Sequence, residues 1–241
     1  MNKFPIYKPL GKRAILIEWP EKIDENILNE IILFQKRVES LKADKLQDTI
    51  IGYNSLTLVY CKAYKDYDTE INEISSLNTL CTLEPKRNNR LWRIPVCYDE
   101  EFGIDLLEMS EKLDLSVGEI VKLHSENIYT VYFIGFLPGF LYLGGLHDKL
   151  VMPRRDNPRI RVSKGSVGIG GSQTGVYPID SAGGWNIIGR TPVSFFNIKQ
   201  EKPCFAKAGD NIQFIPISKS DYFELEKKIK AGNYILKVQL I

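Results

Sequence analysis

The chain has 241 residues, of which 44% are hydrophobic, enough for the core of one large domain or two modest ones. Its 32 Lys and Arg residues nearly balance 30 Asp and Glu residues, so no overall field favours nucleic acid or an acidic membrane surface as a partner. The apolar runs fall well short of the roughly 18 residues of a membrane span. Because the four cysteines form no C-x-x-C pair and the N-terminus lacks the apolar core of a signal peptide, we expect a cytoplasmic protein.

Residues 1–86 predict a small α+β domain. Residues 13–19 are apolar enough for a strand, and a helix is expected after an N-cap at Asp24. Residues 49–62 predict two strands or one bent strand, and a second helix ends before Pro85. The side chains expected on the apolar faces of these helices are Ile27, Ile31, Phe34, Val38 and Leu41, and then Ile71, Ile74, Leu77 and Leu80. We expect the two helices to pack on a sheet, and residues 84–90 to form a linker.

Residues 87–241 predict a mainly-β barrel domain. Two short helices are expected over residues 105–113 and 116–125, the second with a capping box formed by Ser116 and Glu119. Beyond them, 12 of the 18 glycines lie between residues 135 and 189, among short strand-like runs. The apolar stretch 133–146 predicts the end of a core strand and then a glycine-hinged turn over residues 135–140. Its last part is expected to lead toward residue 153, with exposed aromatic side chains facing a partner. A helix over 221–231 and a last strand close the domain.

Two local patterns have competing interpretations. The helix pair has the length of a DNA-binding helix-turn-helix, but its second helix offers mainly Lys122 for reading bases, so a structural hairpin is favoured. His124 lies at the end of that helix without an acidic partner at obvious spacing, which favours a structural role.

Residues 165–172 have the glycine spacing of a P-loop, but Gly171 stands where the phosphate-binding lysine is required. What remains is a glycine-rich turn whose N–H groups could meet an anion. With two histidines and no adjoining acidic or thiol cluster, we expect no tightly bound metal.

A basic segment is the strongest signal for a binding site. Between residues 151 and 198 there are six basic and two acidic residues, and five of the six basic ones lie within residues 153–164. Arginine offers a rigid fork to carboxylate or phosphate, which suits a small acidic substrate or a nucleotide, although a solvated basic loop explains the charge equally well. Residues 171–192 then interleave glycines with polar and aromatic side chains, as a binding pocket requires. No Ser-His-Asp arrangement or spaced carboxylate pair is apparent in the sequence.

Several long segments resemble the allophanate hydrolase subunit 1 family, whose domain is the carboxyltransferase domain, subdomain C and D. They are residues 95–106, 120–124, 132–146, 153–192 and 208–210. The resemblance implies a small N-terminal α+β domain followed by a cyclophilin-like β-barrel, without implying prolyl isomerase activity. The sequence departs from the family pattern at Ser163 and Lys164, where Pro-Ala is usual, and at Ala182, where proline is usual.

The family includes the B subunit of the ATP-dependent prokaryotic 5-oxoprolinase. The resemblance therefore implies a hydrolase subunit, inactive alone, that works together with the homologous C subunit of that enzyme and with its A subunit to convert 5-oxo-L-proline to L-glutamate. It implies ATP, with Mg²⁺, as the co-substrate of the complex. Two alternatives stay open: an inhibitor of a sensor histidine kinase, and the carboxyltransferase half of a urea carboxylase or allophanate hydrolase system. The latter needs a separate biotin carrier, because this chain has no biotin-attachment motif.

The resemblance also implies a set of site residues. We expect proton transfer or hydrogen bonding to substrate from His124, charge neutralisation from the arginines, and substrate orientation by Gln173 with Tyr177. The expected catalytic residues are His124, Arg155 and Gln173, and the expected substrate-binding residues are Arg154, Arg159, Ser166, Tyr177, Trp185 and Arg190.

Overall fold

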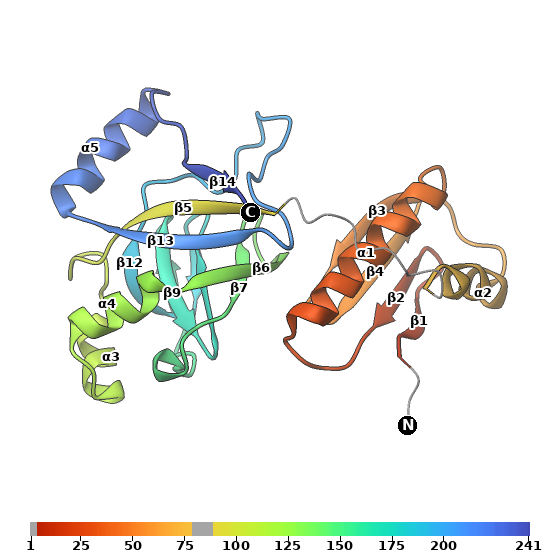
Figure 1. Cartoon of the computed structure of the whole chain (residues 1–241), viewed down its shortest axis with the longest axis horizontal. Coiled ribbons are helices and arrows are strands. Elements are labelled where there is room, and N and C mark those ends of the chain that lie inside the picture. Colours follow the sequence, from red (N-terminus) through yellow and green to blue (C-terminus); the bar gives the residue numbers. More distant parts are fainter. Residues whose placement is uncertain (1–3, 79–88) are drawn as a thin grey trace. The chain divides into compact units, whose positions relative to one another are not determined.

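The structure, a computed structural model, describes residues 4–78 and 89–241. Contacts within the chain divide it into two compact units, Met1–Arg87 and Asn88–Ile241 (Figure 1). The predicted domain boundary between residues 86 and 87 and most of the predicted linker lie outside the described residues. No helix in the two described ranges is long and apolar enough to cross a membrane.

The N-terminal unit is a four-stranded antiparallel sheet, in the order β1-β2-β4-β3, with two helices packed on its apolar face. Its elements are β1 (Ile6–Leu10), β2 (Ala14–Glu18), α1 (Glu25–Lys42), β3 (Leu46–Ile51), β4 (Ser55–Tyr60) and α2 (Tyr67–Asn78). The strand at residues 13–19 is confirmed. Of the two interpretations of residues 49–62, the pair of strands is correct, although β3 begins earlier than predicted, at Leu46. Strand β1 was not expected, because Lys8 and Pro9 interrupt its apolar pattern, but proline is tolerated on an edge strand such as this one.

Helix α1 begins after Asp24, whose side chain caps it as predicted. The expectation that Leu41 lies on the buried face is wrong: Leu41 is 60% exposed, whereas Leu28 and Lys42 are buried. The buried stripe passes through Lys42 because its ammonium group is neutralised by acidic side chains of α2. Leu80, which was expected on the apolar face of the second helix, lies outside the described residues.

The C-terminal unit is a closed seven-stranded barrel, which confirms the predicted α+β unit followed by a mainly-β barrel. The strand order is β12-β9-β10-β7-β6-β13-β5, and pairing of β12 with β5 closes the ring. Strand β14 extends the sheet from β5. The strands are β5 (Arg90–Cys97), β6 (Ile128–Ile134), β7 (Leu141–Gly144), β9 (Ser166–Gly170), β10 (Gln173–Val176), β12 (Asn186–Arg190), β13 (Asn211–Ile217) and β14 (Val238–Leu240). A separate two-stranded sheet joins β8 (Arg159–Val162) to β11 (Ser181–Gly183).

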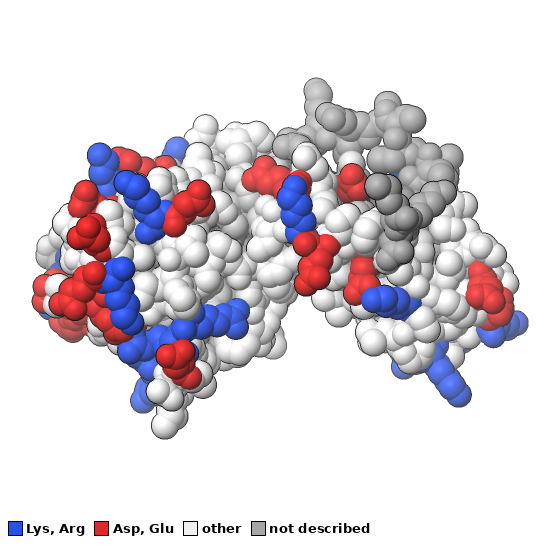
Figure 2. Space-filling model, turned by 90° about the horizontal axis from the view of Figure 1, so that it is seen from below, with Lys and Arg blue, Asp and Glu red and all other residues white. Residues whose placement is uncertain are grey.

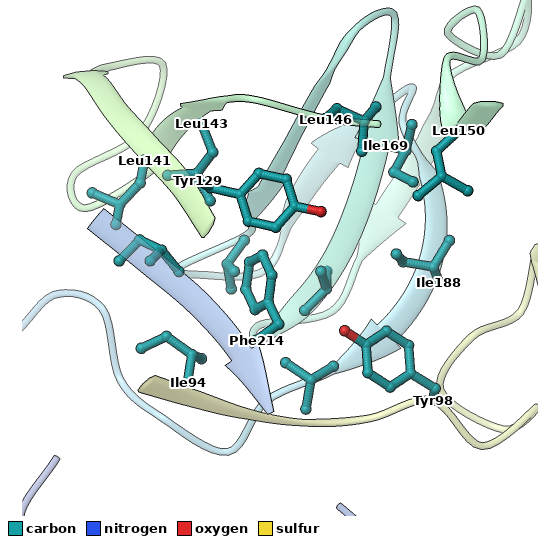
Figure 3. Close-up of a cluster of buried hydrophobic side chains, with 14 of the residues drawn as sticks. Ile94, Tyr98, Tyr129, Leu141, Leu143, Leu146, Leu150, Ile169, Ile188 and Phe214 are labelled. Carbon is teal, nitrogen blue, oxygen red and sulfur yellow. The ribbon is translucent and has the colours of Figure 1, made fainter. Parts of the chain in front are cut away.

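The barrel interior is filled by side chains that alternate inward along the strands (Figure 3). Phe214 lies near the middle of this core, between Tyr98 and Tyr129 in the view shown. Helices α3 (Leu106–Leu113) and α4 (Val117–Glu126) form the predicted hairpin, and the predicted capping box of Ser116 and Glu119 is present. Helix α4 buries Ile120 and His124 in the barrel core. The remaining helical elements are η1 (Asp148–Leu150) and α5 (Lys219–Lys230).

The apolar stretch 133–146 forms the end of β6 and a tight turn, as predicted, and then β7, which was not predicted as a strand. Phe136 lies in this turn with a φ of 64° and is 63% exposed. Phe140, in contrast, is 2% exposed and packs against Tyr177 and Trp185. A Cβ at Gly139, whose φ is 83°, would lie 2.8 Å from Phe196 Cβ, so the turn needs glycine there. That the exposed ring of Phe136 faces a partner stays a prediction.

Candidate functional site

Asp105 is the centre of a polar cluster in the barrel unit. It precedes α3, and its residue is 2% exposed. Its Oδ2 accepts a 2.6 Å hydrogen bond from the backbone N–H of Ile187, which ties it to β12. Its Oδ1 accepts hydrogen bonds from both Arg155, at 3.0 Å, and Arg159. One buried carboxylate thus holds two of the predicted site arginines in fixed positions.

Arg155 also contacts a second carboxylate, that of Glu108, at 2.8 Å. Hydrogen bonds from Lys112 and Arg155 lower the pKa of Glu108 to about 2. The backbone N–H of Arg155 donates to Gly184 O at 2.7 Å, which fixes the segment that carries the arginine. The Arg155 side chain remains 28% exposed, so it is accessible from one side while its other side is paired.

Asp105 and Glu108 were not predicted from the sequence as members of the site. Asp105 stands 50 positions before Arg155 in the chain and Glu108 stands 47 before it, so a count of local charge could not pair them. Asp105 does lie inside residues 95–106, one of the segments that resemble the family. That resemblance was the signal from which Asp105 could have been identified as a site residue.

The larger cavity of the barrel unit opens beside Arg155 and has a volume of about 580 Å³. This volume suits a small organic substrate. Its lining combines both signs of charge, from Glu108, Lys112, Arg154, Arg155 and Asp156, with the amides of Asn157 and Asn186. The guanidinium of Arg154 lies 5.9 Å from the ring centroid of Trp185, within the range of a cation–π contact. Figure 2 shows the same mixture of signs, with basic and acidic side chains interspersed on the face drawn.

An aromatic cluster, formed by Phe140, Tyr177 and Trp185 with Val162 and Ile187, is separate from the main barrel core. Strand β10 separates the two, because alternate residues point to opposite faces: Val176 packs in the main core, whereas Tyr177 packs in the aromatic cluster. Burial raises the pKa of Tyr177, so its hydroxyl stays neutral.

Gln173 carries an unpaired amide. It is 7% exposed, and its Nε2 is buried without a hydrogen-bond partner among the described residues. By the alternation along β10, Gln173 is on the strand face of Tyr177, opposite to Thr174. A buried amide nitrogen without an acceptor is unfavourable, and an acceptor on a bound ligand would satisfy it.

His124 lies in the main core and is fully buried. Its Nδ1 lies 2.8 Å from Tyr98 Oη and its Nε2 lies 2.8 Å from Thr174 Oγ1. The imidazole stacks on Phe214 with ring centroids 4.7 Å apart, and its backbone carbonyl accepts from Tyr129 Oη. Burial lowers the pKa of His124 to about 3, so the ring is neutral. Its predicted catalytic role stays a prediction, and the contacts seen here are those of a positioning residue on the inner side of β10.

The predicted site residues therefore lie in four neighbouring environments of one unit. Arg154 and Arg155 line the larger cavity, and Arg159, Ser166 and Arg190 line a smaller one of about 100 Å³. Tyr177 and Trp185 belong to the aromatic cluster, and His124 belongs to the core. The described residues contain no group of three or more His, Cys, Asp or Glu side chains placed to hold a metal ion.

A small α+β unit followed by a closed barrel is a fold that other solved structures share. The Kluyveromyces lactis urea amidolyase shares the fold with a TM-score of 0.81 at 16% identity, over 98% of this chain and 16% of that chain. The family model of the carboxyltransferase domain, subdomain C and D, matches residues 5–206, so the chain belongs to that family.

Relatives in the family align with most of the chain. A Bacillus subtilis protein, named as the B subunit of 5-oxoprolinase, is 34% identical over 88% of this chain and 93% of its own length. A protein of the same name from Escherichia coli O157:H7 is 46% identical over 56% of this chain and 61% of its own length. The solved structure of TTHA0988 has a TM-score of 0.75 at 29% identity, over 86% of this chain. This chain spans 40% of that larger protein.

Proposed function

We propose that the chain is the B subunit of an ATP-dependent 5-oxoprolinase. The observation that carries the proposal is the near end-to-end match, at 34% identity, to a relative with that name. The match covers both units of this chain, so it includes the small α+β unit as well as the barrel. The urea carboxylase relatives support the common fold, but they match at lower identity and within much longer proteins.

In this proposal the chain contributes one barrel to a complex with two further proteins, the homologous C subunit of 5-oxoprolinase and its A subunit. The complex hydrolyses the lactam amide of 5-oxo-L-proline to give L-glutamate, with ATP and its Mg²⁺ as co-substrate. The chain is inactive alone, and its cytoplasmic location stays a prediction. Its larger cavity, which is open on one side, offers a surface at which the homologous barrel can complete the site.

The residue roles follow from the chemistry of the substrate. Arg155 is accessible and held by two carboxylates, so it can meet the substrate carboxylate without losing its orientation. The Gln173 amide, which lacks an acceptor, is assigned to a carbonyl oxygen of the substrate. Tyr177 and Trp185 pack in the aromatic cluster, which lies on the Gln173 face of β10. Arg154, which lies over Trp185, adds a second positive charge to the larger cavity. His124 keeps β10 in place from the core side.

The proposal is tested by expressing the chain with the A and C subunits and assaying the purified complex. We expect ADP and L-glutamate to form only when 5-oxoproline and all three proteins are present. A complex that assembles but forms no glutamate would contradict the proposal, as would full turnover without this chain. The kinase-inhibitor and carboxyltransferase alternatives both predict no glutamate formation, so the same assay separates them from the proposed function.

A further inference from the structure

We infer that the smaller cavity beside Arg190 is a binding site for a small oxyanion, separate from the larger cavity. It has a volume of about 100 Å³ and lies between the start of α3, the β8 strand and β12. Its lining contains three guanidinium groups and two hydroxyls, from Arg159, Arg161, Arg190, Ser163 and Ser166. The only carboxylate among its lining residues, Glu101, forms an ion pair with Lys219.

The three arginines differ in how fully they are neutralised. Arg161 donates from both Nε and Nη2 to Asp180 at 3.0 and 2.6 Å, and its side chain is 76% exposed. Arg190 donates from Nε to the Lys164 carbonyl and lies 5.8 Å from the Phe102 ring centroid. No carboxylate of the described residues forms an ion pair with Arg190. The charge of Arg190 does help to lower the pKa of Asp180, but the carboxylate of Asp180 pairs directly with Arg161. An anion in the cavity would give Arg190 a direct partner.

Arg159 has an unused hydrogen-bond donor. Its Nη2 donates to Asp105, but its Nη1 is buried with no partner in the described part of the chain. Buried guanidinium nitrogens are normally paired, because an unpaired one loses its hydration without compensation. An acceptor in the adjoining cavity would satisfy it. This buried nitrogen and the lack of an ion-pair partner for Arg190 among the described residues are two independent observations, and both favour an anion.

The hydroxyl side of the cavity is built on a rigid turn. Gly165 has a φ of 82°, and a Cβ at this position would collide with the carbonyl oxygen of Thr191. Its N–H donates to Tyr177 O at 2.8 Å, and the N–H of Ser166 donates to Ser163 O at 3.1 Å. The turn thus places Ser166, which is 6% exposed, at the cavity wall in a fixed conformation. A preorganised hydroxyl loses little entropy when it binds an oxyanion.

The size of the cavity restricts the ligand. A volume of about 100 Å³ admits a phosphate or a carboxylate-bearing group but not a nucleotide, whose sites are several times larger. Asp105 pairs with one arginine of each cavity, because Arg155 lines the larger one and Arg159 lines the smaller one. That the oxyanion is phosphate from ATP, or the carboxylate of 5-oxoproline, rests on the proposed function; anion binding itself does not.

The test is calorimetric titration of the whole chain with inorganic phosphate and, separately, with 5-oxoproline, at constant ionic strength. We expect saturable 1:1 binding of at least one of them. Arg190→Gln should weaken that binding by about tenfold or more, and Ser166→Ala by about threefold or more. Arg93→Gln is the matched control, because it removes the same charge from β5 outside both cavities, and we expect a change within about twofold.

Three outcomes would overturn the inference. The first is that neither anion binds saturably. The second is that Arg93→Gln and Arg190→Gln weaken binding equally. The third is that Arg154→Gln, in the larger cavity, weakens binding while Arg190→Gln does not.

Circular dichroism checks that each variant is folded. If Arg190→Gln does not fold, the effect of Ser166→Ala on binding decides the test. Phosphate binding without 5-oxoproline binding identifies a phosphate site, and the reverse identifies a carboxylate site. If the chain binds phosphate while the complete 5-oxoprolinase complex is inactive, the anion site stands and the proposed function fails.

Discussion

His124 and Thr174 are joined inside the barrel by a 2.8 Å hydrogen bond between the imidazole Nε2 and the hydroxyl Oγ1. Thr174 donates its single hydroxyl hydrogen to Gly168 O at 3.0 Å, so it must accept from Nε2–H. The other ring nitrogen, Nδ1, then accepts from the Tyr98 hydroxyl. The ring is thereby fixed as the neutral Nε2–H tautomer, and it links α4 to β9 and β10 through buried hydrogen bonds.

Replacement of Thr174 by valine tests this link. Thr174→Val keeps the shape of the side chain but leaves the Nε2–H of His124 unpaired in the core, so the free energy of unfolding should fall by about 1–3 kcal/mol. Thr174→Ser, which keeps the hydroxyl, should lose less. Urea denaturation measures both variants. A valine variant as stable as the original chain would show that this hydrogen bond does not stabilise the barrel.

The pH dependence of stability follows from the buried imidazole. The folded-state pKa of His124 is about 3, below the usual value of 6.5, because burial disfavours the charged ring. The unfolded chain therefore takes up a proton below pH 6.5 that the folded chain does not. The free energy of unfolding should fall as the pH drops from 6.5 towards 3, by up to about 1.4 kcal/mol per pH unit.

A comparison with His124→Gln isolates this contribution, because all other titrating groups are common to both chains. Between pH 7 and pH 5, the original chain should lose about 2 kcal/mol more than the variant in urea denaturation. NMR of the ring should show no titration of His124 between pH 5 and 8. A titration of this ring near pH 6.5 would contradict its place in the core.

Asp105 and Glu108 both contact Arg155, but they should differ in their effect on stability. Asp105→Asn leaves Arg155 and Arg159 without their shared buried charge, so we expect a loss of about 3 kcal/mol or more. Glu108→Gln removes a carboxylate whose side chain is 38% exposed, and it should cost less than about 1 kcal/mol. Thermal unfolding of both variants checks this, and similar losses for the two would argue against Asp105 as the centre of the cluster.

Gln173 should show opposite effects on stability and activity. Gln173→Leu removes a buried amide nitrogen that has no partner among the described residues, so stability should stay the same or rise. Turnover of the complete complex should fall by about tenfold or more if the amide binds substrate in the transition state. The melting temperature and the rate of glutamate formation are measured on the same preparation. A destabilised variant with normal turnover would assign Gln173 a structural role.

The N-terminal unit contains one ion pair that should matter for its stability. The ammonium of buried Lys42 lies 2.6 Å from Glu70 Oε1 and from Glu73 Oε2, and Tyr60 Oη donates to Glu70 at 3.0 Å. Lys42→Met leaves the Glu70 carboxylate buried without its cation, at a cost of about 3 kcal/mol. Lys45→Met, at a half-exposed side chain 3.7 Å from Glu73, should cost below about 1 kcal/mol. Hydrogen exchange of the β2 and β4 amides measures the loss of stability in each variant. Equal protection in Lys42→Met and Lys45→Met would contradict the larger role assigned to Lys42.

Most elements of the fold were predictable because their patterns are local. The capping residues Asp24 and Ser116 mark the starts of α1 and α4, and the short apolar runs between glycines indicate the strands of the barrel. The structure differs from the sequence-based prediction at two places in the N-terminal unit, and both differences have physical causes. Strand β1 contains Lys8 and Pro9, which an edge position tolerates, and Lys42 replaces Leu41 on the buried face of α1 because α2 supplies its counter-charges.

The site was less predictable because its contacts are long-range. The arginines between residues 154 and 190 were identified from the sequence, but the orientation of Arg155 and Arg159 depends on Asp105, about fifty positions earlier. The tautomer of His124 depends on Thr174, which is also 50 positions away. The family resemblance gave the positions of these residues without their contacts.

The central claim is tested most directly by glutamate formation from 5-oxoproline in the complete complex, with Arg155→Ala beside the original chain. Arg159 still pairs with Asp105 in the variant, so we expect it to fold and assemble. The original complex should form glutamate with ATP, and the Arg155→Ala complex should form it at least about tenfold more slowly. An assembled original complex without glutamate formation would contradict the proposed function. Full turnover with Arg155→Ala would contradict the assigned site.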